Sequence, residues 1–400
     1  MIIPRLVISP STSLRGSSRC IIHNAIIIDY IEQTTRARAR ARLFSTFSAR
    51  LTDKTKSKFK ILFCGSDDFS VASLKAVHNA HDLWESIDVV VPPEREIGRG
   101  GKHHKSLEKY THGIAALQQY ALSHSLPTHT VPSEGIKSWT PPNPFTMPSP
   151  SHILLTASFG HIIPLRLLKL FPEDHRLNVH PSLLPRWRGA APVQWTITNS
   201  DKTTGVSVQR LVKFSQGVDA GDIAGSVSAI EVPHDATYAT FLPHLAEIGG
   251  KLLVDLLRRL QNGTATFNPQ DESGITLAPK ITHETARVDW QEKTAEEIDR
   301  IHRGIGHQVH LWTSILSTTA HFISLQPLPP SEYPNHLMSE AGTAHLIKEG
   351  KVRRLFVSCG KGTWLEVVEV QMAGKKVMGV KDWWNGLPRE VRDRGWVKMG

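Results

Sequence analysis

An Asn-x-His pair stands at the end of a predicted strand and is suited to chemistry at a carbonyl group. Asn178 and His180 alternate with the apolar Leu177 and Val179, and Pro181 follows. Side chains two residues apart on a strand face the same side, and proline ends the strand because it lacks an N–H. An amide donates hydrogen bonds without changing its charge, and an imidazole can donate, accept or carry a proton near neutral pH. The pair therefore suits stabilisation of an oxyanion that forms on a carbonyl under attack.

A carboxylate would complete such a site, because it can orient an imidazole or accept a proton. Asp219 is the best candidate, since it stands between Gly217 and Gly221, which let the backbone come close to a ligand. A second interpretation remains open at this point. An Asn-x-His pair can be an ordinary strand end, and Asp219 can be a turn residue.

Strands and helices alternate over residues 58–270, as they do in a doubly wound α/β domain. We predict strands at 59–65, 87–91, 153–157 and 205–212, and helices at 69–80, 112–124, 164–171 and 238–260. This order indicates a mostly parallel, Rossmann-like sheet, in which ligands bind beyond the carboxyl ends of the strands. Asp67 or Asp68 should cap the first helix. The first turn, Gly65–Phe69, lacks the three-glycine phosphate cradle, which argues against a nicotinamide-dependent enzyme.

Residues 285–400 predict a second, smaller domain after a polar linker at 271–284. The capping box of Thr294 and Glu297 opens a short helix, and β-prone runs follow at 310–315, 321–325, 355–359 and 363–370. Short strands between turns indicate a small antiparallel barrel of the OB type, a frequent nucleic-acid platform. Basic residues such as Arg354 would supply charge, and Trp383–Trp384 would add apolar or stacking surface. Charged barrel faces can equally serve solubility alone.

The net charge of +10 is concentrated at the two ends of the chain. Residues 1–50 hold eight Arg and two acids, and residues 341–400 hold twelve Lys or Arg and six acids, so each end carries +6. The basic C-terminal domain favours a polyanionic partner. The Arg-rich, Ser-rich and acid-poor N-terminus predicts a mitochondrial transit peptide, and therefore the mitochondrial matrix. A basic arm that binds nucleic acid is the alternative.

Cysteine, histidine and hydropathy patterns argue against several other classes of protein. The three cysteines show neither disulfide nor zinc spacing, and the 21 histidines form no HExxH or other zinc pattern. No apolar run reaches the ~18 residues that a membrane span needs. We therefore expect no metal and no membrane contact. We also expect a monomer.

A basic and glycine-rich loop is predicted at 92–105, between the second strand and the following helix. It contains Arg99 and Lys102 among several glycines. Such a loop is by default a solvated surface segment. The functional alternative is a clamp on a phosphate backbone.

The residues from Asn178 to Gln194, Asn-Val-His-Pro-Ser-Leu-Leu-Pro-Arg-Trp-Arg-Gly-Ala-Ala-Pro-Val-Gln, resemble the core signature of the 10-formyltetrahydrofolate-dependent formyltransferase family. The Arg-Trp-Arg-Gly-Ala-Ala-Pro part is most similar to the methionyl-tRNA branch of that family, and the N-terminal address is typical of its mitochondrial type. The resemblance covers nearly all of Phe59–Asn385. In one departure, Gly304–Val309 replaces the Asn-Pro-Trp-Pro element expected after the capped helix.

This resemblance implies a role for each site residue. Asn178, His180 and Asp219 match the family's catalytic residues, and Ser182, Leu183, Leu184 and Pro185 match its tetrahydrofolate-contacting segment. Arg99, Lys102, Lys375 and Lys376 are expected to contact tRNA. The implied reaction transfers the formyl group of 10-formyltetrahydrofolate to the α-amine of methionyl-tRNA. Asn178 and His180 would hold the oxyanion, and Asp219 would orient His180 and assist proton transfer.

Two alternatives are compatible with the same fold. The first is a formyltransferase that acts on a small-molecule amine, such as a glycinamide ribonucleotide or an amino sugar nucleotide. The second is a catalytically silent mitochondrial RNA-binding protein, because fold alone does not establish activity. The basic C-terminal barrel weighs against the first alternative, and the intact Asn178, His180 and Asp219 weigh against the second.

Overall fold

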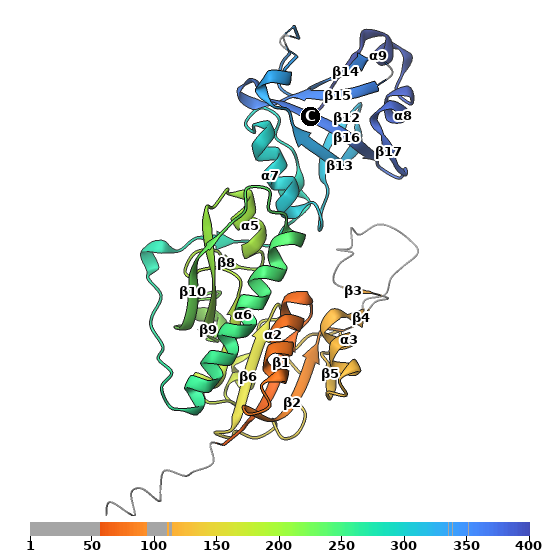
Figure 1. Cartoon of the computed structure of the whole chain (residues 1–400). Helices are drawn as coiled ribbons and strands as arrows, with labels where there is room; N and C mark the ends of the chain where they lie inside the picture. Colours follow the sequence, from red (N-terminus) through yellow and green to blue (C-terminus); the bar gives the residue numbers. More distant parts are fainter. Residues whose placement is uncertain (1–56, 94–109, 112–113, 335, 338, 351) are drawn as a thin grey trace, which may run out of the picture. The chain divides into compact units, whose positions relative to one another are not determined.

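The computed structural model describes residues 57–93, 110, 111 and 114–400, except positions 335, 338 and 351 (Figure 1). The predicted transit peptide and the basic loop with Arg99 and Lys102 lie outside the described residues. Within these residues no helix is long and apolar enough to cross a bilayer.

A seven-stranded sheet forms the first half of the structure, in the order β10–β9–β7–β6–β1–β2–β5. The strands are β1 (Phe59–Gly65), β2 (Trp84–Val91), β5 (Thr128–Thr130), β6 (His152–Ala157), β7 (Arg176–His180), β9 (Thr203–Arg210) and β10 (Ile223–Glu231). The strands from β5 to β7 in this order pair in parallel, and β9 is antiparallel to both β7 and β10. The predicted mostly parallel sheet is confirmed. The strand order reverses between β1 and β6, which is where open α/β sheets bind ligands.

Two helices, α2 (Asp68–Asn79) and α6 (Tyr238–Gln261), pack against each other and cover one face of this sheet (Figure 1). Asp67 caps α2, since its carboxylate accepts a hydrogen bond from the Ser70 amide. Gly250 allows the close approach of the helices, because a Cβ there would lie 2.9 Å from Ala76 Cβ. The long helix predicted at 238–260 is confirmed almost to the residue.

The opposite face of the sheet carries a smaller apolar core, built on Leu62, Cys64 and Leu154. Loops and the short α4 (Leu165–Leu168) cover it, so the helix predicted at 164–171 is limited to one turn. The helix predicted at 112–124 is α3 (Ala116–Ser123), preceded by the paired β3 (Tyr110–Thr111) and β4 (Ile114–Ala115).

The C-terminal residues form a second sheet, in the order β12–β13–β16–β15–β14–β18, with β17 on β16. These strands are β12 (Leu311–Ile315), β13 (Thr318–Pro327), β14 (Thr343–Glu349), β15 (Val352–Ser358), β16 (Trp364–Met372), β17 (Val377–Gly379) and β18 (Trp396–Lys398). A bridge between Ile315 and Met399 joins the two edges, so the antiparallel sheet is nearly closed into the predicted barrel. The predicted capping box opens α7 (Ala295–Ile305).

The prediction that Trp383–Trp384 form a stacking surface is wrong. Both residues lie in α8 (Val380–Asn385), where Trp383 is 2% and Trp384 4% exposed. The helix turns both indoles into the barrel core. A last short helix, α9 (Arg389–Arg394), follows α8. Arg354 is not a free cation either, because its guanidinium lies 2.8 Å from Glu366 and 3.2 Å from Glu332.

The residues that replace the expected Asn-Pro-Trp-Pro element lie at the end of α7. There Gly304 packs on α5 (Pro192–Thr198), since a Cβ would lie 2.8 Å from Thr198 Oγ1. His307 stacks on Tyr238 at the start of α6, with ring centroids 3.8 Å apart. These contacts join the C-terminal half to the first half of the structure without a proline-tryptophan motif.

Candidate active site

Asn178 lies in a row of polar side chains that crosses three strands. Register pairs Asn178 of β7 with Thr156 of β6 on one side and with Gln209 of β9 on the other. The Thr156 hydroxyl donates a 2.7 Å hydrogen bond to Asn178 Oδ1. This bond orients the amide, so its Nδ2 group is left without an acceptor among the described residues. An oriented amide donor of this kind can bind an oxygen that gains negative charge.

His180 is the last residue of β7 and is only 4% exposed. Its Nε2 lies 2.9 Å from the carbonyl oxygen of Trp187, an atom that can only accept, so Nε2 carries the proton of this hydrogen bond. In the neutral imidazole Nδ1 then bears a lone pair. That nitrogen faces Asp219 Oδ2 at 3.7 Å.

Asp219 is held on its carboxylate by two donors from different parts of the chain. Gln209 Nε2 donates to Oδ1 over 2.7 Å, and the Gly189 amide donates to Oδ2 over 2.9 Å. The residue has a positive φ of 49°, a conformation that costs a non-glycine residue roughly 1–3 kcal/mol. The next residue but one, Gly221, must be glycine, because a Cβ there would lie 1.8 Å from the Arg210 carbonyl oxygen.

The signature loop, Pro181–Gly189, returns from His180 towards Asp219. Ser182 is fully buried and its hydroxyl donates to the Arg186 carbonyl, while Leu184 is also buried. Leu183 and Pro185 remain half-buried. The folate-contacting segment predicted at 182–185 is therefore a tight turn whose serine hydroxyl already has a partner within the loop.

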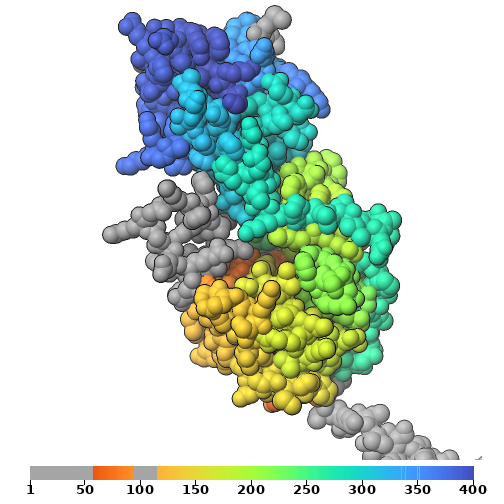
Figure 2. Space-filling view, turned by 180° about the vertical axis from the view of Figure 1, so that it is seen from behind, coloured from red at the N-terminus to blue at the C-terminus, as the bar shows by residue number. Residues whose placement is uncertain are grey.

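The residues predicted as a linker return to this loop. β11 (Leu277–Ala278) pairs in parallel with β8 (Arg188–Gly189), and the Trp187 amide donates to Thr276 Oγ1 over 2.8 Å. Figure 2 shows the teal part of the chain that holds this segment on the surface of the molecule. The segment thus fixes both the carbonyl that binds His180 and the amide that binds Asp219.

Three residues of this arrangement were not predicted as site residues: Thr156, Gln209, and Gln270, whose side-chain amide donates to the Asp219 carbonyl over 2.8 Å. Thr156 stands out as a hydroxyl in the apolar run 153–157, and that pattern could have indicated it. Gln209 does not stand out, because β9 also contains Thr203, Thr204 and Ser207. Gln270 carries no such signal, because only the return of the chain to the Asp219 turn places it there.

The arrangement can stabilise negative charge and store a proton. At 3.7 Å, the lone pair of His180 Nδ1 and Asp219 Oδ2 are too far apart for a direct hydrogen bond. A proton taken up by Nδ1 would point towards the carboxylate, whose negative charge would stabilise the imidazolium across this gap. Among the described residues no cluster of three His, Cys, Asp or Glu side chains is arranged for a metal ion.

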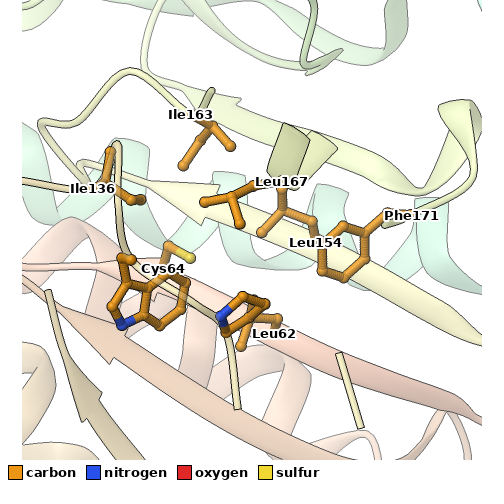
Figure 3. Close-up of a pocket in the computed structure, with 9 residues that line it drawn as sticks. Leu62, Cys64, Ile136, Leu154, Ile163, Leu167 and Phe171 are labelled. Carbon is orange, nitrogen blue, oxygen red and sulfur yellow. The ribbon is translucent and has the colours of Figure 1, made fainter. Parts of the chain in front are cut away.

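A cavity lies on the same face of the sheet, between β1, β6 and α4 (Figure 3). Its volume is about 10 Å³, and apolar side chains such as Leu62, Leu154 and Leu167 line it together with Cys64. This space holds about one water-sized sphere. The cavity is a packing gap in the core and is too small for a ligand.

Two family models match successive parts of the chain. The model described as "Formyl transferase" matches residues 148–257, and "Formyl transferase, C-terminal domain" matches residues 280–388. The methionyl-tRNA formyltransferase of Acidobacterium capsulatum is 34% identical over 332 residues, which cover 82% of this chain and 96% of the relative. The chain belongs to the methionyl-tRNA formyltransferase family. The mitochondrial methionyl-tRNA formyltransferase of Mus musculus is 30% identical, over 83% of this chain and 79% of the relative.

Solved structures show the same fold. A sugar 3N-formyl transferase, WlaRD, superposes with a TM-score of 0.52 at 16% identity, over 80% of this chain and all of that one. That structure was determined in the presence of dTDP and 5-N-formyl-tetrahydrofolate. The formyltransferase fold predicted from the sequence is confirmed, and the relatives at 30–34% identity place the chain on the methionyl-tRNA branch of the family rather than among the sugar enzymes.

Of the residues expected to contact tRNA, Lys375 and Lys376 are described. They lie in the turn between β16 and β17, within the residues that match the C-terminal domain model, and both are exposed. Arg99 and Lys102 lie outside the described residues.

Proposed function

We propose that this chain transfers the formyl group of 10-formyltetrahydrofolate to the α-amino group of methionyl-tRNA, with Asn178, His180 and Asp219 as its catalytic residues. The observation that carries the proposal is the position of the His180 imidazole, between the Trp187 carbonyl and the Asp219 carboxylate, on the strand that also carries Asn178. Membership of the methionyl-tRNA formyltransferase family supplies the identity of the acceptor.

The reaction begins when the unprotonated α-amine attacks the formyl carbon. A carbon–nitrogen bond forms, and the carbonyl electron pair moves onto oxygen. Asn178 Nδ2 donates to this oxyanion, because Thr156 holds the amide with its oxygen turned away. When His180 takes up a proton from the attacking amine, the imidazolium that forms adds positive charge beside the oxyanion.

The attacking amine must lose a proton, and the departing N10 must gain one. His180 Nδ1 accepts the proton, and the negative charge of Asp219 Oδ2, 3.7 Å away, stabilises the imidazolium that forms. Passing a proton to N10 as the carbon–nitrogen bond breaks restores the neutral imidazole. The hydrogen bond to the Trp187 carbonyl keeps Nε2 protonated throughout. Nδ1 is therefore the ring nitrogen that takes up and releases the transferred proton.

The co-substrate is the second part of the proposal. The structure of the sugar formyltransferase that shares this fold was determined in the presence of a formyl-tetrahydrofolate. The turn Ser182–Pro185 follows His180 directly, and the half-buried Leu183 and Pro185 are the parts of it that remain available to a ligand. Ser182 and Leu184 support this turn from within, through Ser207, whose Oγ accepts from the Leu184 amide and donates to the Ser182 carbonyl.

The tRNA-contacting residues and the cellular address are further parts of the proposal. Exposed Lys375 and Lys376, together with Arg99 and Lys102, would bind phosphates of the acceptor tRNA. The acid-poor residues 1–50 would direct the chain to the mitochondrial matrix, as the name of the mouse relative suggests. N-terminal sequencing of protein from its natural source tests the address; an intact Met1 would contradict it.

The function is tested with purified protein and labelled 10-formyltetrahydrofolate. Methionyl-tRNA, an amino sugar nucleotide and a glycinamide ribonucleotide are offered as acceptors side by side. We expect label on methionyl-tRNA only. Transfer to a small amine, or no transfer at all, would contradict the proposal.

A further inference from the structure

We infer that Gln270 is a positioning residue for catalysis, which holds the main chain of Asp219 so that its carboxylate faces His180. This inference rests on the proposed function. It extends the site to a residue beyond the end of β10 and α6, in the segment that leads into the C-terminal domain.

The Gln270 side-chain amide uses its donors and its acceptor in the site. Its Nε2 donates to the carbonyl oxygens of Asp219 and Gly221, over 2.8 and 2.7 Å. Its Oε1 accepts from Arg188 Nε and Nη2, over 2.9 and 2.7 Å. Because a guanidinium can only donate, Arg188 fixes which end of the amide faces the turn.

The turn at Asp219 has a particular need for such support. Asp219 has a φ of 49°, a conformation that non-glycine residues rarely adopt unless their surroundings enforce it. Gly217, with a φ of 114°, precedes the turn and adds conformational freedom. The two hydrogen bonds from Gln270 hold the carbonyls on either side of Ala220, and therefore the course of the main chain through the turn.

The carboxylate of Asp219 is held by Gln209 and by the Gly189 amide, and Gln270 Nε2 also lies 3.4 Å from Gln209 Oε1. Gly189 in turn is placed by the pairing of β8 with β11. Gln270 therefore positions the main chain of Asp219, while Gln209 and the Gly189 amide position its carboxylate. Both are needed to fix the 3.7 Å approach to His180 Nδ1.

Gln270 is half-buried and belongs to none of the apolar core clusters of the described residues. Its loss should therefore affect the Asp219 turn more than the fold. We expect Gln270→Leu to lower kcat by about 10- to 100-fold, the effect of misplacing a catalytic group by about 1 Å. The KM values for methionyl-tRNA and for 10-formyltetrahydrofolate should stay within about twofold, since the hydrogen bonds of Gln270 all go to protein groups, in the Asp219 turn and at Arg188 and Gln209.

A double-mutant cycle with Asp219→Asn separates positioning from a general structural effect. If Gln270 acts through Asp219, adding Gln270→Leu to Asp219→Asn should lower the single-turnover rate by less than about threefold. An effect as large as in the wild-type background would show that the two residues act independently, and would overturn the inference.

Two further variants keep the test decisive. Gln270→Glu retains the acceptor for Arg188 and the length of the side chain but, when ionised, cannot donate to the two carbonyls. It should lose kcat as Gln270→Leu does, and it serves alone if the leucine variant does not fold. Gln326→Leu removes a glutamine that bonds Glu366 in the barrel, and it should leave kcat unchanged.

The outcomes distinguish this inference from the proposed function. If wild-type protein transfers formyl groups and both Gln270 variants retain kcat within twofold, the positioning role is wrong and the function stands. If wild-type protein transfers no formyl group to methionyl-tRNA, the proposed function fails first, and the positioning role fails with it.

Discussion

The Thr156 hydroxyl lies 2.7 Å from Asn178 Oδ1, across the parallel pair β6 and β7. A planar amide can be rotated by a half-turn, which would exchange its oxygen and its nitrogen. The Thr156 bond favours the orientation that presents Nδ2 to an incoming oxygen. The strand register therefore controls a chemical property of the site, namely which atom of Asn178 meets the substrate.

We expect Thr156→Val to lower kcat by about 10-fold. The substitution keeps the shape of a side chain that is only 4% exposed, but it removes the hydroxyl that orients Asn178. A hydrogen bond of this kind contributes about 1 kcal/mol, or roughly fivefold to tenfold in an equilibrium between two orientations. Steady-state kinetics of formyl transfer provide the measurement.

Thr156→Ser retains the hydroxyl and should restore most of the rate. Thr313→Val is the matched control, because Thr313 is also buried and accepts a hydrogen bond from Trp290 Nε1 in the barrel. Equal loss of kcat in the Thr156→Val and Thr156→Ser variants would point to packing rather than to amide orientation.

Asn178→Ala and His180→Ala should each reduce turnover by about 10²–10³-fold, the usual effect of removing one group that stabilises an oxyanion. Binding of the folate co-substrate should persist, because neither change disturbs the turn Ser182–Pro185. Calorimetric titration with 10-formyltetrahydrofolate and single-turnover transfer rates measure the two properties separately. Near-normal single-turnover rates in both variants would refute the catalytic assignment.

The sequence predicts the parts of this site that depend on local patterns. Alternation along β7 placed Asn178 and His180 on one face, and the glycines around Asp219 indicated a turn near a ligand. The pairing of β11 with β8 has no comparable local signal, since a polar stretch predicts a linker whether or not it returns to the site. The neighbouring tryptophans of α8 illustrate the opposite error. Their basic surroundings indicated a surface, but tertiary packing turned both rings inward.

The charges proposed to bind tRNA can be tested through salt dependence. We expect Lys375→Ala with Lys376→Ala to weaken methionyl-tRNA binding and to reduce the slope of log affinity against log salt by about one for each lost phosphate contact. Arg99→Ala with Lys102→Ala should act in the same way. The measurement is a filter-binding titration at several salt concentrations.

Lys75→Ala is the control for this charge series. Lys75 is exposed on α2, a helix that covers the first sheet, and it has no assigned role in tRNA binding. Its loss changes the net charge by one without removing a proposed phosphate contact. Unchanged salt slopes in both paired variants would identify these cations as ordinary solvated surface.

His307 makes the stability of the fold depend on pH. Its imidazole stacks on Tyr238 with ring planes 4° apart, and its Nδ1 is buried without a partner among the described residues. Burial lowers the pKa of His307 from 6.5 to about 4. Between these values the unfolded chain binds a proton that the folded chain does not, so the free energy of unfolding decreases as the pH falls from about 6.5 towards 4.

His307→Phe should therefore reduce the loss of Tm between pH 7.5 and pH 5.0. Phenylalanine retains an aromatic ring for the stack on Tyr238 but takes up no proton at any pH. Thermal unfolding at both pH values, followed by circular dichroism, measures the difference. His234→Phe, at an exposed position, is the matched control and should leave the pH dependence as it is in the wild type. If His307→Phe and wild type lose the same Tm on acidification, the buried imidazole does not contribute to the acid sensitivity of the fold.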